Sequence, residues 1–238
     1  MKKFAFFALT TLATAAMAVQ PVTPGSITIH SGAVSIQAAS IVGTPIRNTS
    51  NANNDALQNV ASNSGRIDIR GYSEQRANTL RGSVTNEAVD RNDFANQNIS
   101  SNAGKVEVAS RGISVQQMSS TDSSVGNKAS GTNATALQNL ASNNGNVDIN
   151  GDSRQTVSLT NTGVFNEASG RNSLATQNLS SNFGKVLIAG LSNQTTSLSS
   201  ATIVNLARGA NSHAAQNIAS NDACNEPRMP CPTCHNGD

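Results

Sequence analysis

Apolar and polar residues alternate at every second position in four short segments of this chain. The segments are RIDI at Arg66, KVEV at Lys105, NVDI at Asn146 and KVLI at Lys185. Alternation with period two is typical of a half-buried strand. Each segment follows the local pattern SN-x-G, and Asn and Gly both tolerate the positive φ angles of tight turns. The pattern therefore predicts a turn and then a strand in each unit.

The same turn closes an octapeptide that occurs five times. Its copies are QNVASNSG at Gln58, QNISSNAG at Gln97, QNLASNNG at Gln138, QNLSSNFG at Gln177 and QNIASNDA at Gln216, spaced 39 to 41 residues apart. The apolar third residue of each copy predicts another strand before the turn. A fixed period of this length indicates a stack of similar units that bury their faces against one another. We therefore expect an all-β fold, a repeat β-solenoid or stacked cross-β arches with about 39 residues per repeat.

A helical interpretation of the stretches that contain Ala and Gln, such as residues 133–140, is the alternative. Their density of Asn, Ser, Thr and Gly disfavours it, because these residues are poor in helix interiors.

Side-chain amides recur in register with the octapeptide. A second set of glutamines lies 22 residues before the next octapeptide in every unit: Gln75, Gln116, Gln155 and Gln194. Asparagine recurs five residues before the octapeptide, as at Asn92, Asn133 and Asn172. Two extra residues within 109–111 account for the single 41-residue period. One local insertion thus explains the irregular spacing.

Stacked parallel strands add about 4.8 Å per layer and bring like residues into ladders. An amide in a ladder can donate to one neighbour and accept from the other. We therefore expect buried assembly ladders formed by both glutamine sets and by these asparagines, that is by Gln58, Gln97, Gln138, Gln177, Gln216, Gln75, Gln116, Gln155, Gln194, Asn92, Asn133 and Asn172. The alternative is that the amides lie on the surface of a soluble β-solenoid. Asp68, Glu107 and Asp148 also fall in register, and Arg66 and Lys105 are placed to offset their charge.

Neither end of the repeat array carries a polar cap. Residues 26–37 still alternate like a strand, and their GAVSI resembles the half-unit GRIDI that begins at Gly65. The fifth octapeptide stops without the second half of its unit. An uncapped stack offers unpaired backbone groups to another chain, and end-to-end addition that does not close generates a filament.

The first 18 residues have the features of a cleavable signal peptide. Lys2 and Lys3 precede an apolar run from Phe4 to Met17, and Ala16-Met17-Ala18 supplies the small residues of a cleavage site. The run is shorter than the roughly 20 apolar residues of a transmembrane helix, and no later segment is long enough. We expect a secreted protein without a transmembrane segment, which passes through the periplasm to the cell exterior or surface.

Composition excludes several function classes. Two of the 16 basic residues lie in the signal segment, which leaves 14 to balance 14 acidic residues and argues against nucleic acid as a partner. The chain has no Trp and one Tyr, so the interior must be built from small, β-branched and amide side chains, and the monomer could be disordered before it assembles. The repeats offer almost no residues for acid, base, nucleophilic or metal chemistry. We therefore expect no enzyme and no catalytic residue.

The repeats resemble those of secreted bacterial functional amyloids. The resemblance rests on N-x-A-x-x-x-N-x-x-x-x-Q-N followed by SN-x-G and an alternating strand, and it covers roughly residues 47–234. Curlin subunits have similar but shorter units, and the Fap-type fibril subunit is closer, since its tail also carries a Cys-x-x-Cys, here Cys231-Pro-Thr-Cys234. Here the units abut directly, whereas the Fap-type major subunits have longer linkers. The resemblance implies self-association into a fibril, a related minor or nucleating subunit, and an outer-membrane export channel as partners.

The tail holds the one sharp chemical motif. Cys231, Cys234 and His235 match the c-type haem attachment pattern, C-x-x-C-H, but the tail has no apolar segment to enclose a haem. Zinc binding is a further alternative. We expect redox or disulfide chemistry at Cys224, Cys231 and Cys234, with no metal or cofactor. If two of the three form a disulfide, the third remains to bond to another part of the chain or to another chain.

Taken together, the sequence predicts a signal peptide (1–18), an N-terminal leader with a degenerate half-repeat (19–46), imperfect amyloid-like repeats (47–223) and a Cys- and Pro-rich tail (224–238). The predicted function is a structural subunit of an extracellular amyloid-like fibre, active in biofilm matrix and adhesion. A secreted or surface β-solenoid adhesin is the first alternative, and a haem electron-transfer protein is the second.

Overall fold

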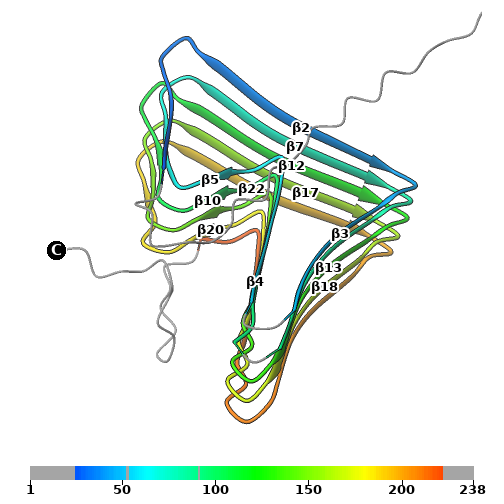
Figure 1. The fold of residues 1–238 in the computed structure, drawn as a ribbon. Coiled ribbons are helices and arrows are strands. Elements are labelled where there is room, and N and C mark those ends of the chain that lie inside the picture. The colour runs from blue at the N-terminus through cyan, green and yellow to red at the C-terminus, as the bar shows by residue number, and fades with distance from the viewer. Residues whose placement is uncertain (1–24, 52–53, 91, 222–238) are drawn as a thin grey trace, which may run out of the picture.

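The chain winds into a parallel β-solenoid of five coils (Figure 1). The computed structural model describes residues 25–51, 54–90 and 92–221, and these residues form 24 strands and no helix. Each coil passes through five sheets in the same order, which we name A to E. The predicted all-β stacked repeat is thus confirmed. The helical alternative for 133–140 is wrong, because β14 (Ala136–Leu140) lies in a sheet there.

Sheet A contains the strands that the alternating pattern predicts. Its strands are β1 (Ser26–Ile29), β6 (Arg66–Ile69), β11 (Val106–Val108), β16 (Val147–Ile149) and β21 (Leu187–Ile188). Ile67 and Ile69 are fully buried, whereas Asp68 between them faces outward. This is the half-buried arrangement expected from period-two alternation.

Sheets B and C follow in each coil and contain the longest strands. Sheet B consists of β2 (Val34–Val42), β7 (Tyr72–Leu80), β12 (Ile113–Thr121), β17 (Asp152–Thr160) and β22 (Leu191–Ser199). Sheet C consists of β3 (Pro45–Asn51), β8 (Ser83–Asp90), β13 (Ser124–Gly131), β18 (Gly163–Gly170) and β23 (Thr202–Arg208).

Sheets D and E complete each coil. Sheet D consists of β4 (Asp55–Val60), β9 (Phe94–Ile99), β14, β19 (Ala175–Leu179) and β24 (Ala214–Ile218). Sheet E consists of β5 (Asn63–Ser64), β10 (Asn102–Ala103), β15 (Asn143–Asn144) and β20 (Asn182–Phe183), and a single bridge from Asn182 to Asn221 extends it. In Figure 1, sheets C and D run together as an arm that projects below the broad sheet B.

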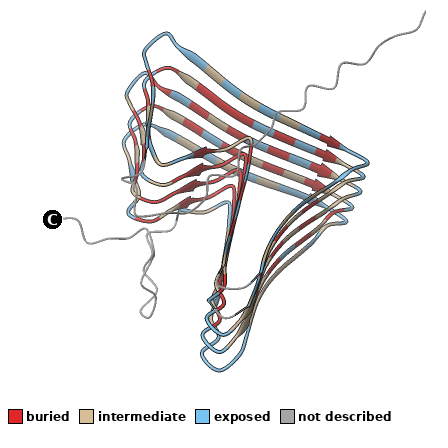
Figure 2. Cartoon of the chain, in the orientation of Figure 1, coloured by how far each residue is buried: buried red, intermediate tan, exposed pale blue. Residues whose placement is uncertain are grey.

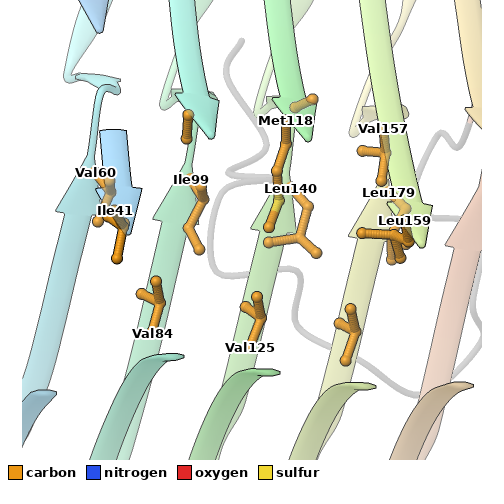
Figure 3. Packing of buried hydrophobic residues seen from close by; sticks show 13 residues of the cluster. Ile41, Val60, Val84, Ile99, Met118, Val125, Leu140, Val157, Leu159 and Leu179 are labelled. Carbon is orange, nitrogen blue, oxygen red and sulfur yellow. The ribbon is translucent and has the colours of Figure 1, made fainter. Parts of the chain in front are cut away.

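Three clusters of apolar side chains fill the solenoid. The largest lies where sheets B, C and D meet and includes Val84, Ile99, Met118 and Leu140 (Figure 3). Between sheets C and D the buried apolar side chains are all alanines, among them Ala88 and Ala95, so the two sheets of the arm lie close together. The third cluster lines sheet A. Figure 2 shows that buried residues concentrate in the middle coils, whereas strand β2 of the first coil is largely exposed.

The corner after sheet D requires an unusual backbone angle in every coil. At the end of sheet D, the fourth residue of the octapeptide turns the chain with φ between 47° and 51° (Ala61, Ser100, Ala141, Ser180 and Ala219). The serine that follows satisfies the corner: Ser101 Oγ lies 3.0 Å from the carbonyl oxygens of Ile99 and Asn139, and it accepts from Ser142 N–H at 3.1 Å. The fourth and fifth residues of the octapeptide thus form the corner, which explains why a small residue and a serine recur there.

The first coil is more complete than the sequence suggested. The residues that pair with Arg66–Ile69 are Ser26–Ile29, so the predicted match of GAVSI to GRIDI has the wrong register; Val34 and Ser35 pair instead with Tyr72 and Ser73 in sheet B. The expected leader therefore contributes β1 and β2 to a full coil, and its expected boundary at residue 46 falls within β3. The two-residue insertion at 109–111 is confirmed, since Val106 pairs with Ile67 but Ile113 pairs with Tyr72.

Any side chain at the glycine before sheet A should destabilise the fold. Gly104 has φ +119°, and a Cβ built on it would lie 2.2 Å from the carbonyl oxygen of Gly65 in the preceding coil. We expect Gly104→Ala to lower the free energy of unfolding by at least about 1–3 kcal/mol, measured by denaturant titration.

Gly126→Ala is the matched control. The nearest atom to its added Cβ is Thr85 Cγ2 at 3.7 Å, so this variant should be unchanged or up to about 1 kcal/mol more stable. Equal stability of the two variants would show that the glycine turn is not a constraint of the coil.

Candidate assembly interface

A ladder of glutamine amides runs through the arm from the first coil to the last. Each glutamine of the octapeptide donates from Nε2 to Oε1 of the glutamine one coil earlier: Gln97 to Gln58 at 2.8 Å, Gln138 to Gln97 at 2.8 Å, Gln177 to Gln138 at 2.6 Å and Gln216 to Gln177 at 2.5 Å. Gln97, Gln138 and Gln177 are fully buried, and Gln216 in the last coil is exposed. The structure therefore places all five residues in one column.

The second glutamine set forms a shorter ladder in sheet B. Gln75 donates to Gln37 at 3.0 Å, Gln116 to Gln75 at 3.3 Å and Gln155 to Gln116 at 3.0 Å. The ladder stops at the last coil, because Gln194 Nε2 donates to Asn221 Oδ1 and Ser192 Oγ instead. Gln155 Oε1 is consequently buried without a hydrogen-bond partner among the described residues.

Three asparagine ladders accompany the glutamines, and none of them was among the predicted ladder residues. In sheet C, Asn48 donates to Asn86 at 2.7 Å, and Asn86, Asn127 and Asn166 each donate to the next member at 2.8 Å. In sheet E, Asn63, Asn102, Asn143 and Asn182 each donate to the asparagine one coil later at 2.9 Å. The third ladder lies beside the glutamines of sheet D and runs from Asn59 to Asn217.

Two of these ladders could have been predicted from the octapeptide, because its asparagines recur at the same period as its glutamine. Its second residue is the asparagine of the sheet D ladder. Its sixth residue is the asparagine of the sheet E ladder, which the turn pattern alone does not place in a ladder. Gln37 belongs to the sheet B ladder but not to the predicted set, because the match of GAVSI to GRIDI places the first coil in the wrong register.

The predicted asparagine ladder at Asn92, Asn133 and Asn172 occupies a different environment. These residues lie at the tip of the arm and are exposed. Asn133 Nδ2 donates to Asn92 Oδ1 at 3.3 Å, while Asn172 is joined to the coil before it through its backbone N–H, which donates to Thr132 O at 3.2 Å. They do not form a buried amide ladder.

The charged column of sheet A lies on the outer face of the solenoid. Asp68, Glu107 and Asp148 stack as expected, and the cation that pairs with Asp68 is Arg70 at 2.7 Å rather than Arg66. The hydrogen bond to Asp68, and next its charge, raises the pKa of Arg70. In sheet B, Glu74 accepts from Tyr72 OH at 2.9 Å and pairs with Arg76. Burial, and next this hydrogen bond, raises the pKa of Tyr72.

Among the described residues, no group of three or more His, Cys, Asp or Glu side chains could hold a metal ion. That part of the chain also has no helix long and apolar enough to cross a bilayer. Cys224, Cys231, Cys234 and His235 lie outside the described residues, as does the predicted signal peptide.

The two terminal coils expose the edges of the same sheets. Each of sheets A to D begins with a strand of the first coil and ends with a strand of the fifth coil. Each edge strand pairs on one side only, because its other side has no strand among the described residues. Unpaired strand edges of this kind are sites where a further strand can add.

Comparison with known proteins found no relative: no family model, curated protein or solved structure matches the chain. The features of the chain that bear on its function are the ladders and the strand edges of the terminal coils.

Substitution of Gln138 tests whether the buried ladder stabilises the fold. Its Nε2 donates to Gln97 Oε1 and Phe165 O, and its Oε1 accepts from Gln177. In Gln138→Glu an ionised carboxylate would face two acceptors, at a cost of about 1–3 kcal/mol for each unsatisfied group and more for the charge. The folded state should raise the pKa of this carboxyl above its unfolded value of about 4.3. Stability should therefore be close to wild type below about pH 4 and fall as the pH rises, in denaturant titrations at each pH.

Gln117→Glu is the control, because Gln117 is exposed on the outer face of sheet B beside Arg76. It should unfold like the wild type at every pH. If Gln138→Glu is equally stable at pH 7, the amide ladder does not contribute to the fold.

Proposed function

We propose that this protein is a structural subunit that polymerises, end to end through its open coils, into an extracellular amyloid-like fibre. The observation that carries the proposal is the pair of terminal coils. Both present the strand edges of sheets A to D, and the amide ladders of sheets C and D run from the first coil to the fifth. A second copy can continue these sheets and these ladders, and repeated addition by one rotation and translation gives a filament.

The interior of the solenoid suits such a fibre. Parallel in-register strands with stacked Asn and Gln amides and tightly packed small side chains are the elements that stabilise cross-β assemblies. The outer surface carries single charged columns and no metal-ligating cluster among the described residues. A structural role agrees with this interior.

Secretion, partners and the role of the tail belong to the same proposal. The signal-like residues 1–18 support export beyond the inner membrane, and the resemblance of the repeats and of Cys231-Pro-Thr-Cys234 to Fap-type subunits supports biofilm matrix as the setting. An outer-membrane export channel and a related nucleating subunit are the partners that this resemblance implies. The cysteines would act in redox or disulfide chemistry.

Purified protein without residues 1–18 tests the proposal. At micromolar concentration it should form filaments after a lag that preformed seeds shorten, and fibre diffraction should show a meridional reflection near 4.8 Å. The measurements are dye-binding kinetics, electron microscopy and diffraction. Protein that remains a monodisperse monomer for days, with or without seeds, would contradict the proposal and favour the adhesin alternative.

A further inference from the structure

We infer that copies of this chain add in one orientation and one register, with the first coil of one copy on the fifth coil of the next, so that the filament is polar. The inference rests on the proposed self-assembly and names its partner surface. It follows from the direction in which the amide ladders donate.

The ladders run in opposite directions in different sheets. The glutamines of sheet D donate toward the first coil, as from Gln138 to Gln97. The asparagines of sheets C and E donate toward the fifth coil, as from Asn127 to Asn166 and from Asn102 to Asn143. Each end of the solenoid therefore presents donors in some columns and acceptors in others, and the two ends carry opposite patterns.

Among the described residues, no further coil follows the fifth to supply the partners that the internal coils have. Gln216 Nε2 donates to Gln177, which leaves Gln216 Oε1 as the acceptor at this end. Asn205 Nδ2 donates to the carbonyl oxygens of Ala175 and Ala215. One coil earlier, Asn166 Nδ2 also donates to Asn205 Oδ1, but the described residues offer no asparagine acceptor of this kind to Asn205. Asn221 accepts from Asn182, and its Nδ2 has no acceptor among the described residues.

The first coil offers the complementary groups in the same columns. Gln58 Oε1 accepts from Gln97, so its Nε2, which reaches Thr85 O at 3.2 Å, is the donor nearest the open end. Asn48 donates to Asn86, which leaves Asn48 Oδ1 as an acceptor. In the register of the internal coils, Gln58 would donate to Gln216 of the neighbouring copy, and Asn48 would accept from Asn205.

Apolar side chains at the open end also match this register. Leu198 and Ile218 face inward in the fifth coil and are 48% and 39% exposed, whereas Leu159 and Leu179, their equivalents one coil earlier, are 1% and 0% exposed. The first coil of a neighbouring copy would place Ile41 and Val60 over them, because these residues occupy the same columns. The added contact therefore resembles the junctions within one chain.

A contact between two like ends does not have this fit. Reversing one copy reverses the order in which the five sheets follow one another around the solenoid, so the donor and acceptor columns of the two copies no longer lie over one another. The outline of the coil is also asymmetric, with an arm on one side of sheet B (Figure 1), so that a reversed copy would not place its arm over the arm below.

One corner of the junction must shift to allow this contact. Ala33 occupies the position of Gly112, because Ala33 and Gly112 precede Val34 and Ile113, which both pair with Tyr72. A Cβ on Gly112 would lie 2.0 Å from Ile69 O. The corner between sheets A and B is therefore the part of the junction that differs from an internal one.

A pair of blocked variants tests the orientation. Ser50 and Ala207 are half-buried and face inward in the alanine column of sheet C, at the first and fifth coils. Ser50→Arg and Ala207→Arg should block one end each, since the arginine can point out of an open end but not into a closed junction. Sedimentation velocity should find each variant monomeric alone and dimeric in a 1:1 mixture, with no longer species.

Thr49→Arg and Leu206→Arg are the controls, because they lie one residue earlier on the outer face of the same strands. Both should form filaments like the wild type. Dimers formed by either blocked variant alone would show contact between like ends and overturn the inference, while wild-type filaments would still support the proposed function. Failure of the wild type to polymerise overturns the proposed function as well.

Cross-linking tests the same inference without altering the coil faces. Ser40 and Ser197 are exposed and belong to one outward column of sheet B. In chains with the three native cysteines replaced by serine, filaments of the double variant Ser40→Cys with Ser197→Cys should give covalent multimers on oxidation with copper phenanthroline. Each single variant should give none. Covalent dimers from a single variant, or no multimers from filaments of the double variant, would overturn the orientation.

Discussion

The fold depends on the burial of side-chain amides that pair with the same residue one coil away. Gln97, Gln138 and Gln177 are fully buried, and each completes its hydrogen bonds through another glutamine of the column. A buried amide without a partner costs about 1–3 kcal/mol. A slip of one residue between coils would break several ladders at once and turn every inward side chain outward. The ladders therefore fix the register for the whole solenoid.

Close packing also restricts the residues elsewhere in the coil. Sheets C and D approach closely enough that alanine is the apolar residue between them. At the turn before sheet A, the carbonyl oxygen of one glycine occupies the space that a side chain on the next would need. The sharp corners after sheet D use left-handed backbone, and serine hydroxyl groups satisfy the carbonyl oxygens there. The amides, alanines, glycines and serines thus recur because each fits a closely packed or sharply turned position of every coil.

The sequence predicts which residues stack on one another better than it predicts which side chains face inward. The strands of sheet A, the insertion at 109–111 and the glutamine columns follow from spacing, because residues that recur at one period must stack. Spacing alone does not say which side of a strand faces inward. Each left-handed corner interrupts the alternation, so the inward side cannot be counted from sheet D into sheet E. For this reason the sequence predicts Asn63 in a turn alone, although it is buried in a ladder. Asn92 recurs at the repeat period, but it lies in the turn between sheets C and D, where it is exposed.

The same physics also separates folding of the monomer from growth of a filament. The junctions between the five coils of one chain close within that chain, where the linked coils have an effective concentration of roughly millimolar. The next junction joins two chains and carries the additional cost of lost translational and rotational freedom. At micromolar concentration the coils of one chain should therefore close before two chains join. An added copy then gains only the interactions of one junction. The structure of the two terminal coils, and not that of the internal repeats, therefore determines how fast the filament grows.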